Sequence, residues 1–204
     1  RSNNGYLGTG FDWISSLAKD FWVYEKSTNT WSKKADFGGT ARYSAVGFTI
    51  GDNGFIGLGY DGSYLKDFWQ YNATANVWTQ IADFGGFPRA SAVGFNIGSK
   101  GYVGTGSDDS NFYNHYKDFW EYDPAINSWS KKADFGGTAR GGAVGFCINN
   151  KGYLGTGYDG AYRKDFWEYD PVLNIWTQKV DFGGGARFSA VSFSIGSKGY
   201  VGTG

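Results

Sequence analysis

The feature that most constrains this chain is a sequence repeat of about fifty residues. The tetrapeptide Lys-Asp-Phe-Trp begins at Lys19, Lys66, Lys117 and Lys164. The tetrapeptide Asp-Phe-Gly-Gly begins at Asp36, Asp83, Asp134 and Asp181. Successive copies of both motifs start 47, 51 and 47 residues apart. A repeat of this length predicts structural units that pack on their neighbours, because one small unit cannot bury its own apolar faces.

Each repeat predicts four short β-strands, which we call strands a, b, c and d. In one repeat, strand a covers residues 43–50, strand b covers 54–59, strand c covers 67–71, and strand d starts near Trp78. Large apolar and small residues alternate along strand a, which is the period of a β-strand. The Gly-Asp-Asn-Gly stretch at 51–54 favours a tight hairpin turn between strands a and b. No segment shows a helical period, so the predicted fold class is all-β.

The repeat resembles the kelch repeat in three segments. These are Tyr102-Val103-Gly104-Thr105-Gly106, Trp120-Glu121-Tyr122-Asp123-Pro124 and Asn127-Ser128-Trp129. The resemblance implies a β-propeller built from four-stranded antiparallel blades, and the chain is similar to kelch and galactose-oxidase-like arrays of secreted Bacteroidetes-type surface proteins. One departure is regular, because the kelch glycine doublet is replaced here by Gly-Thr-Gly or by Gly57-Leu58-Gly59.

The order of the predicted strands divides the chain into five parts of one propeller segment. They are a partial blade with strands b, c and d (1–39), three blades (40–86, 87–137 and 138–184), and a partial blade with strands a and b (185–204). This makes seventeen predicted strands, whereas a closed ring of four blades needs sixteen. We therefore expect an incomplete segment of a larger propeller.

Composition excludes several classes of function. Lys and Arg together number 19, as do Asp and Glu, and there is no basic block, so nucleic acid is not an expected partner. No run of 18 apolar residues is present, so we expect no membrane insertion. The copper site that a galactose-oxidase resemblance would imply needs two His residues and a Cys–Tyr crosslink, and this chain has one His and one Cys in separate repeats. We therefore expect no metal, no cofactor and no catalytic residues.

The loop between strands b and c is the one part of the repeat that changes length. These b–c loops contain 8, 6, 10 and 6 residues, and in an antiparallel meander they lie at the same end as the connections from strand d to the next strand a. Their aromatic and polar residues suit contact with a protein or a glycan. The candidates are Trp13, Tyr60, Tyr64, Asp108, Asp109, Phe112, Tyr113, His115, Tyr116, Tyr158 and Tyr162. The longest loop (107–116) is the best single candidate, and the alternative is that these rings fold over the blade edges as local core.

One arginine also precedes each strand a. These residues are Arg42, Arg89, Arg140 and Arg187. A ring of arginines could bind carboxylates of a ligand. The alternative is a framework salt bridge to the Asp of Lys-Asp-Phe-Trp or of Asp-Phe-Gly-Gly, which strict repetition favours.

The expected function is a non-catalytic binding or display module, extracellular or at the cell surface. It would present the b–c loops and d–a connections to a protein or glycan partner, as part of a larger chain or surface assembly. Two alternatives stay open. The array could be a structural spacer in a large surface protein, or part of a propeller enzyme whose catalytic residues lie in absent blades.

Overall fold

The structure is a computed structural model that describes residues 4–12, 16–108 and 114–204. These residues form seventeen strands and no helix. Every pair of neighbouring strands is antiparallel, and each sheet is a simple meander. The predicted all-β class with four-stranded antiparallel sheets is therefore confirmed.

The strands form five sheets. The first sheet contains β1 (Gly5–Asp12), β2 (Ser16–Glu25) and β3 (Thr30–Lys33). The second contains β4 (Val46–Ile50), β5 (Asn53–Gly57), β6 (Phe68–Asn72) and β7 (Val77–Ile81). The third contains β8 (Val93–Ile97), β9 (Lys100–Gly104), β10 (Phe119–Asp123) and β11 (Ser128–Lys131). The fourth contains β12 (Val144–Ile148), β13 (Lys151–Gly155), β14 (Phe166–Asp170) and β15 (Ile175–Lys179). The last contains β16 (Val191–Ile195) and β17 (Lys198–Gly202).

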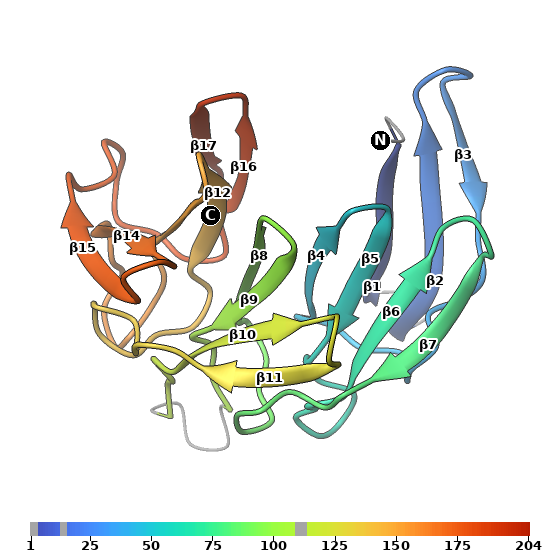
Figure 1. The fold of residues 1–204 in the computed structure, drawn as a ribbon, viewed down its shortest axis with the longest axis horizontal. Helices are drawn as coiled ribbons and strands as arrows, with labels where there is room; N and C mark the ends of the chain where they lie inside the picture. The colour runs from blue at the N-terminus through green and yellow to red at the C-terminus, as the bar shows by residue number, and fades with distance from the viewer. Residues whose placement is uncertain (1–3, 13–15, 109–113) are drawn as a thin grey trace.

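The sheets follow one another around an open arc, with the first and last sheets at its two ends (Figure 1). Strand β4 contacts β8, β8 contacts β12, and β12 contacts β16, so the first strands of consecutive sheets lie side by side. Val46 and Phe48 of β4 pack over Gly94 and Gly101 of the next sheet. A Cβ atom built on Gly101 would lie 2.3 Å from the Phe48 ring, so only glycine allows this close approach.

The outer strands of neighbouring sheets are joined by aromatic packing and hydrogen bonds. The Phe68 ring lies 5.0 Å from the Trp129 ring of the next sheet. The Trp129 indole donates to the backbone oxygen of Ala82, while the Ala82 amide donates to the Asn127 side chain. The same pattern joins Ala35 to Asn76 and Trp78, and Ala133 to Asn174 and Trp176. Each sheet is therefore held chiefly by the sheet beside it.

Candidate functional site

The b–c loops and d–a connections form one surface, which we call the loop face. Each b–c loop bonds to the connection that leads into the next sheet. The amide of Gly59 donates to the oxygen of Arg89 (2.9 Å), and the amide of Arg89 donates to the oxygen of Leu65 (3.1 Å). The amide of Gly106 likewise donates to the oxygen of Arg140 (2.8 Å). These bonds bring the candidate residues of neighbouring sheets to one end of the array.

The Arg89 side chain lies at the base of the loop face and is fully buried. Its two terminal nitrogens donate to the two carboxylate oxygens of Asp118, at 2.5 and 3.0 Å. It also donates to the backbone oxygens of Thr105 and Phe87, each at 3.0 Å. The guanidinium lies 5.0 Å from the centre of the Phe84 ring. Arg42 and Arg140 have the same contacts with Asp67 and Asp165.

The ion pairs of Arg42 and Arg140 change the acidity of their carboxylates. Burial alone would raise the pKa of Asp67, but hydrogen bonds from Arg42 and Trp69 outweigh it, so the pKa is held below its usual value. Arg140 and Trp167 lower the pKa of Asp165 in the same way, also against the effect of burial. Buried, bidentate arginines of this kind fit the framework interpretation better than a ligand-binding one. The carboxylate partner comes from Lys-Asp-Phe-Trp and not from Asp-Phe-Gly-Gly.

Arg187 differs from the other three arginines. It is half-buried, donates to the backbone oxygens of Gly185 (3.0 Å) and Thr203 (2.8 Å), and lies 4.8 Å from the Phe182 ring centre. Among the described residues no carboxylate pairs with it. In the second, third and fourth sheets, the paired carboxylate precedes the third strand of the sheet. The sheet of Arg187 consists of β16 and β17, so the described residues include no counterpart of that strand.

One aromatic cluster on the loop face lies where the first and second sheets meet. The rings of Tyr60 and Tyr64 are 5.0 Å apart, and those of Tyr43 and Tyr60 are 5.6 Å apart. Phe11 of β1 approaches Tyr43 at 6.2 Å. Tyr60 and Tyr64 are half-buried, whereas Phe11 and Tyr43 are exposed. The cluster therefore packs inward through its tyrosine pair and keeps two rings in contact with solvent.

A second aromatic cluster caps the third sheet. The Phe87 ring is 68% exposed and stacks on Tyr116 at 6.0 Å. The other neighbour of Tyr116 is Arg89, whose guanidinium lies 3.9 Å from the ring centre. The Tyr116 hydroxyl donates to Asp108 at 2.8 Å. Burial and this hydrogen bond raise the pKa of Tyr116 to about 12. Tyr116 is thus fixed beneath the exposed Phe87.

The third aromatic cluster covers the fourth and last sheets. The rings of Tyr158 and Tyr162 are 5.4 Å apart, and Tyr162 stacks on Phe188 at 5.5 Å. His115 meets Tyr158 edge-on at 6.0 Å. Both nitrogens of His115 are buried, and neither has a hydrogen-bond partner among the described residues. Tyr162 and Phe188 are exposed.

Acidic side chains of two b–c loops are bonded within the loop face. Asp61 accepts from the hydroxyl of Thr40 at 2.7 Å. Asp159 accepts from Thr138 and from Arg163, the latter at 2.8 Å. Burial would raise the pKa of Asp159, but the bonds from Arg163 and Thr138 outweigh it and the pKa is lowered. These carboxylates stabilise the loops and leave the aromatic rings as the main exposed groups.

The structure brings most of the predicted loop residues to this face. Those that it describes are Tyr60, Tyr64, Asp108, His115, Tyr116, Tyr158 and Tyr162. Trp13, Asp109, Phe112 and Tyr113 lie outside the described residues. Sequence reasoning missed Tyr43, Phe87 and Phe188. The sequence does distinguish them, because each is an aromatic residue at a position where other repeats have a small one. Phe87 stands where other repeats have Thr or Gly. Tyr43 and Phe188 align with Ala90 and Gly141.

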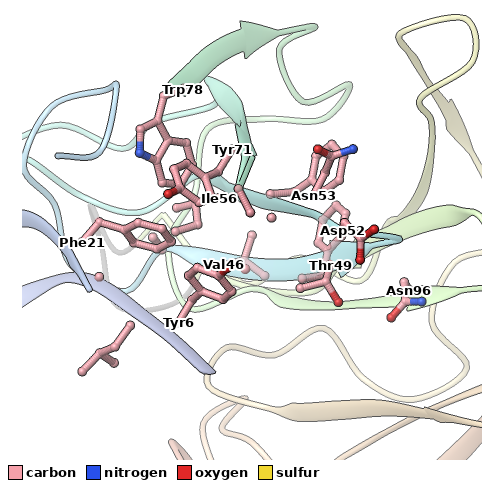
Figure 2. Close-up of a pocket in the computed structure, with 18 of the residues that line it drawn as sticks. Tyr6, Phe21, Val46, Thr49, Asp52, Asn53, Ile56, Tyr71, Trp78 and Asn96 are labelled. Atoms are coloured by element: carbon pink, nitrogen blue, oxygen red, sulfur yellow. The ribbon is translucent and has the colours of Figure 1, made fainter. Parts of the chain in front are cut away.

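A hollow of about 690 Å³ lies apart from the loop face, between the first and second sheets. Tyr6, Phe21, Val46, Tyr71 and Trp78 line its apolar part (Figure 2). Asp52, from the turn after β4, and Asn53, the first residue of β5, stand at its polar end. The hollow therefore opens toward the end of the sheets opposite the loop face.

Among residues 4–12, 16–108 and 114–204, no helix is long and apolar enough to cross a membrane. The same residues contain no cluster of three or more His, Cys, Asp or Glu side chains that could hold a metal ion. Cys147 is half-buried on β12, and burial raises the pKa of its thiol.

No family model and no curated protein matches this sequence. A solved structure titled "Structure of YjhT" is similar to the chain, with a TM-score of 0.77 and 18% sequence identity. The match covers 94% of this chain and 67% of that one. At this identity the likeness shows the fold alone, so it supports a propeller-like array of four-stranded antiparallel sheets and does not extend to membership of the kelch family.

Proposed function

We propose that this chain is a non-catalytic, kelch-type binding module that presents its loop face to a protein or glycan outside the cell. The observation that carries the proposal is the set of exposed aromatic rings on that face. Phe11, Tyr43, Phe87, Tyr162 and Phe188 are all exposed. They lie along the array of sheets, and buried arginine–aspartate pairs fix the framework of its three inner sheets. The extracellular setting rests on the sequence resemblance to secreted kelch arrays.

The chemistry of the rings indicates the kind of partner. An exposed tyrosine offers an apolar face and a hydroxyl edge, which suits the C–H faces of sugars and the side chains of a protein surface. Asp61 and Asp159 are already bonded to hydroxyl or guanidinium groups of the loop face. We therefore expect recognition by stacking and apolar contact more than by charge.

Binding is preferred over the two alternatives because the rings differ from sheet to sheet while the framework repeats. A pure spacer has no need for exposed aromatic residues at positions where other repeats have Thr, Gly or Ala. A propeller enzyme would need catalytic groups from blades outside this chain. Both alternatives predict that removing the exposed rings changes no binding property of the chain.

The test uses single alanine substitutions at Phe87 and Tyr162, one in each of two clusters. The probes are immobilised neutral and acidic oligosaccharides and a library of displayed random peptides. We expect the unmodified chain to select a ligand class, and each substitution to weaken that binding at least about tenfold, as for a central aromatic contact. The melting temperature should stay unchanged because both side chains are exposed.

The matched control is Val172→Ala. Val172 is 88% exposed and lies in the turn between β14 and β15, at the opposite end of the sheets. It should leave binding unchanged. Retention of full binding by both loop-face variants, or failure of the unmodified chain to select any probe, would contradict the proposal.

A further inference from the structure

Alternate copies of the fifty-residue repeat are more alike than neighbouring copies. The stretch Ser-Lys-Lys-Ala-Asp-Phe-Gly-Gly-Thr-Ala-Arg occurs at residues 32–42 and again at 130–140, which is 98 residues later. The stretch Gly-Tyr-Asp-Gly occurs at 59–62 and again at 157–160, also 98 residues later. Neighbouring sheets therefore differ from one another in a regular way.

One such difference is the residue that lies opposite the Lys-Asp-Phe-Trp tryptophan on the last strand of each sheet. This residue is a lysine in the first and third sheets and a glutamine in the second and fourth. The lysines are Lys33 and Lys131, and the glutamines are Gln80 and Gln178. A neutral amide therefore replaces a cation in every second sheet.

This exchange changes which lysine pairs with the aspartate of Asp-Phe-Gly-Gly. In the first and third sheets the aspartate pairs with the lysine of the last strand, at 3.0 Å for Lys33–Asp36 and 3.2 Å for Lys131–Asp134. Glutamine cannot form this ion pair. In the second and fourth sheets the aspartate pairs instead with the lysine of Lys-Asp-Phe-Trp, at 3.9 Å for Lys66–Asp83 and 3.7 Å for Lys164–Asp181.

The remaining lysines of Lys-Asp-Phe-Trp are Lys19 and Lys117. They belong to the first and third sheets, where Asp36 and Asp134 are already paired. Both side chains are exposed, and neither pairs with a carboxylate among the residues that the structure describes. Each ammonium group is therefore available to an anionic ligand.

Lys19 lines a shallow hollow between the first and second sheets, which we call the lysine hollow. Its volume is about 570 Å³, which is within the range of small-ligand sites. Trp69 and Gln80 of the second sheet also line it, and in the described part of the chain nothing bonds to the Gln80 amide. Asp67 lines it too, but its carboxylate is already paired with the buried Arg42 at 2.6 Å. The hollow therefore combines an indole, an amide and one unpaired cation.

The third and fourth sheets carry the same residue types at the equivalent positions. Lys19, Thr40, Trp69 and Gln80 correspond to Lys117, Thr138, Trp167 and Gln178. The indoles of Trp69 and Trp167 donate to an aspartate at 2.7 and 2.8 Å. A Cβ atom on Gly38 or Gly136 would lie 2.6 Å from the same two rings. Both sheets here are four-stranded, so this second position lies inside the array.

The interface between the second and third sheets lacks this arrangement. Its lysine, Lys66, is paired, Phe87 stands in place of the threonine, and Lys131 stands in place of the glutamine. The framework is nevertheless the same, because the Trp120 indole donates to Asp118 at 2.7 Å. The unpaired lysine and the glutamine are therefore not needed to build a sheet or to join it to the next.

We propose that the lysine hollow and its counterpart beside Lys117 bind carboxylate-bearing sugars of an acidic polysaccharide. The ammonium group pairs with the sugar carboxylate, the glutamine amide bonds to ring hydroxyls, and the indole packs against the C–H face of the ring. Two equivalent positions on one array suit a polymer that repeats its charge, because linked sites raise the apparent affinity. This inference rests on the proposed binding function and names a ligand class for it, but it uses residues other than the exposed rings.

The first test compares a fluorescently labelled oligogalacturonate with the same oligosaccharide after methyl esterification of its carboxyl groups. The ester keeps the sugar rings and removes the charge. By fluorescence anisotropy at low salt, the acid should bind about tenfold more tightly than the ester, and added salt should weaken its binding. No binding of the acid, equal binding of acid and ester, or binding that salt does not weaken overturns the proposal.

Matched lysine substitutions locate the site. Lys19→Gln and Lys117→Gln should each weaken binding of the acid about threefold, as for an exposed ion pair, and the double variant about tenfold. The controls are Lys66→Gln and Lys164→Gln, which change the same position in the other two sheets, where the lysine is exposed but paired. They should leave binding unchanged, and all four variants should melt as the wild type does. Equal weakening by all four would mean attraction to general surface charge and would overturn the proposal.

Two further results separate this inference from its neighbours. Oligoglutamate of matched charge is the peptide probe, and binding as tight as that of the oligogalacturonate would overturn the assignment to sugars. Ring-dependent capture of a neutral oligosaccharide or displayed peptide, tested with Phe87→Ala and Tyr162→Ala, would leave the proposed function standing even if Lys19 and Lys117 had no effect, and this inference would then fail. Acid binding that needs both lysines and neither ring would support this inference and contradict the role proposed for the rings.

Discussion

Strands β4 and β16 carry the same pattern, a valine followed two residues later by a phenylalanine, but their surroundings differ. Val46 and Phe48 are buried by the third sheet, and Val191 and Phe193 are half exposed because no described sheet follows theirs. The strand is the same in length and sequence type. Burial of this pattern therefore comes from the next sheet and not from the strand's own sheet.

This difference has a thermodynamic consequence. In a stacked array, stability is close to a sum of terms within each sheet and terms between neighbouring sheets. One substitution should therefore destabilise an inner sheet far more than an end sheet. Matched positions in an inner and an end sheet test this difference.

The largest difference is expected for the buried ion pair. Asp118→Ala leaves Arg89 fully buried without its carboxylate, which should lower the free energy of unfolding by about 3–5 kcal/mol. Asp20→Ala removes a carboxylate that accepts from Trp22 and has no described arginine partner, so it should cost about 1 kcal/mol. Urea unfolding followed by tryptophan fluorescence measures both. Equal losses would contradict the distinction between inner and end sheets.

The next difference is expected for the phenylalanine of the first strand. Phe48→Ala empties a site packed on Gly101 and should cost about 3 kcal/mol. Phe193→Ala removes a ring that is 52% exposed and should cost about 0.5 kcal/mol. Thermal melting monitored by circular dichroism can compare them. A large loss for Phe193→Ala would mean that β16 is covered in solution.

A smaller difference is expected for glycine. Gly101→Ala would place a methyl group 2.3 Å from the Phe48 ring, and this overpacking should cost about 1–3 kcal/mol. Gly54→Ala faces the hollow and should change stability by no more than about 0.5 kcal/mol. Hydrogen exchange of the β4 and β8 amides would localise the effect. Protection in β8 should fall for Gly101→Ala only.

Much of the fold could be predicted from the sequence, because each copy of the repeat predicts the same set of strands. Alternation along strand a and the Gly-rich turns predicted strands that the structure contains at Val46–Ile50 and Asn53–Gly57. The partner of each arginine stayed open, because both candidate aspartates recur with the same spacing. Only the three-dimensional structure shows that Asp67 and not Asp36 reaches Arg42; Asp36 bonds to Lys33 instead.

The candidate site was harder to predict for a related reason. A composition that is 20% aromatic does not distinguish framework rings from exposed ones. Tyr122, on β10, is buried, whereas Tyr162, in the loop between β13 and β14, is exposed. Phe87 stands where the other repeats have Thr or Gly, and its ring is 68% exposed. The hollow beside Gly54 could not be predicted from the sequence, because it depends on how the described parts of the first sheet pack against the second.

The smallest expected difference concerns a tyrosine hydroxyl and its dependence on pH. Tyr122→Phe removes a bond of 2.9 Å to Asn127, which also accepts from the neighbouring sheet, and should cost about 1 kcal/mol at pH 7. Tyr24→Phe removes an exposed bond of 2.8 Å to Asn29, in the turn after β2, and should cost about 0.5 kcal/mol.

The stability that the Tyr122 hydroxyl contributes depends on pH. Burial, with a smaller effect of Asp123, raises the pKa of Tyr122 above its usual 10.0. Its contribution to stability is therefore complete below pH 10 and is lost as the pH rises toward the folded-state pKa, by up to about 1.4 kcal/mol per pH unit. Tyr122→Phe lacks this loss, so urea unfolding should show the variant and the wild type converging between pH 10 and 11. Parallel curves would mean that the Tyr122 hydroxyl titrates alike in the folded and unfolded chains, as an exposed hydroxyl does.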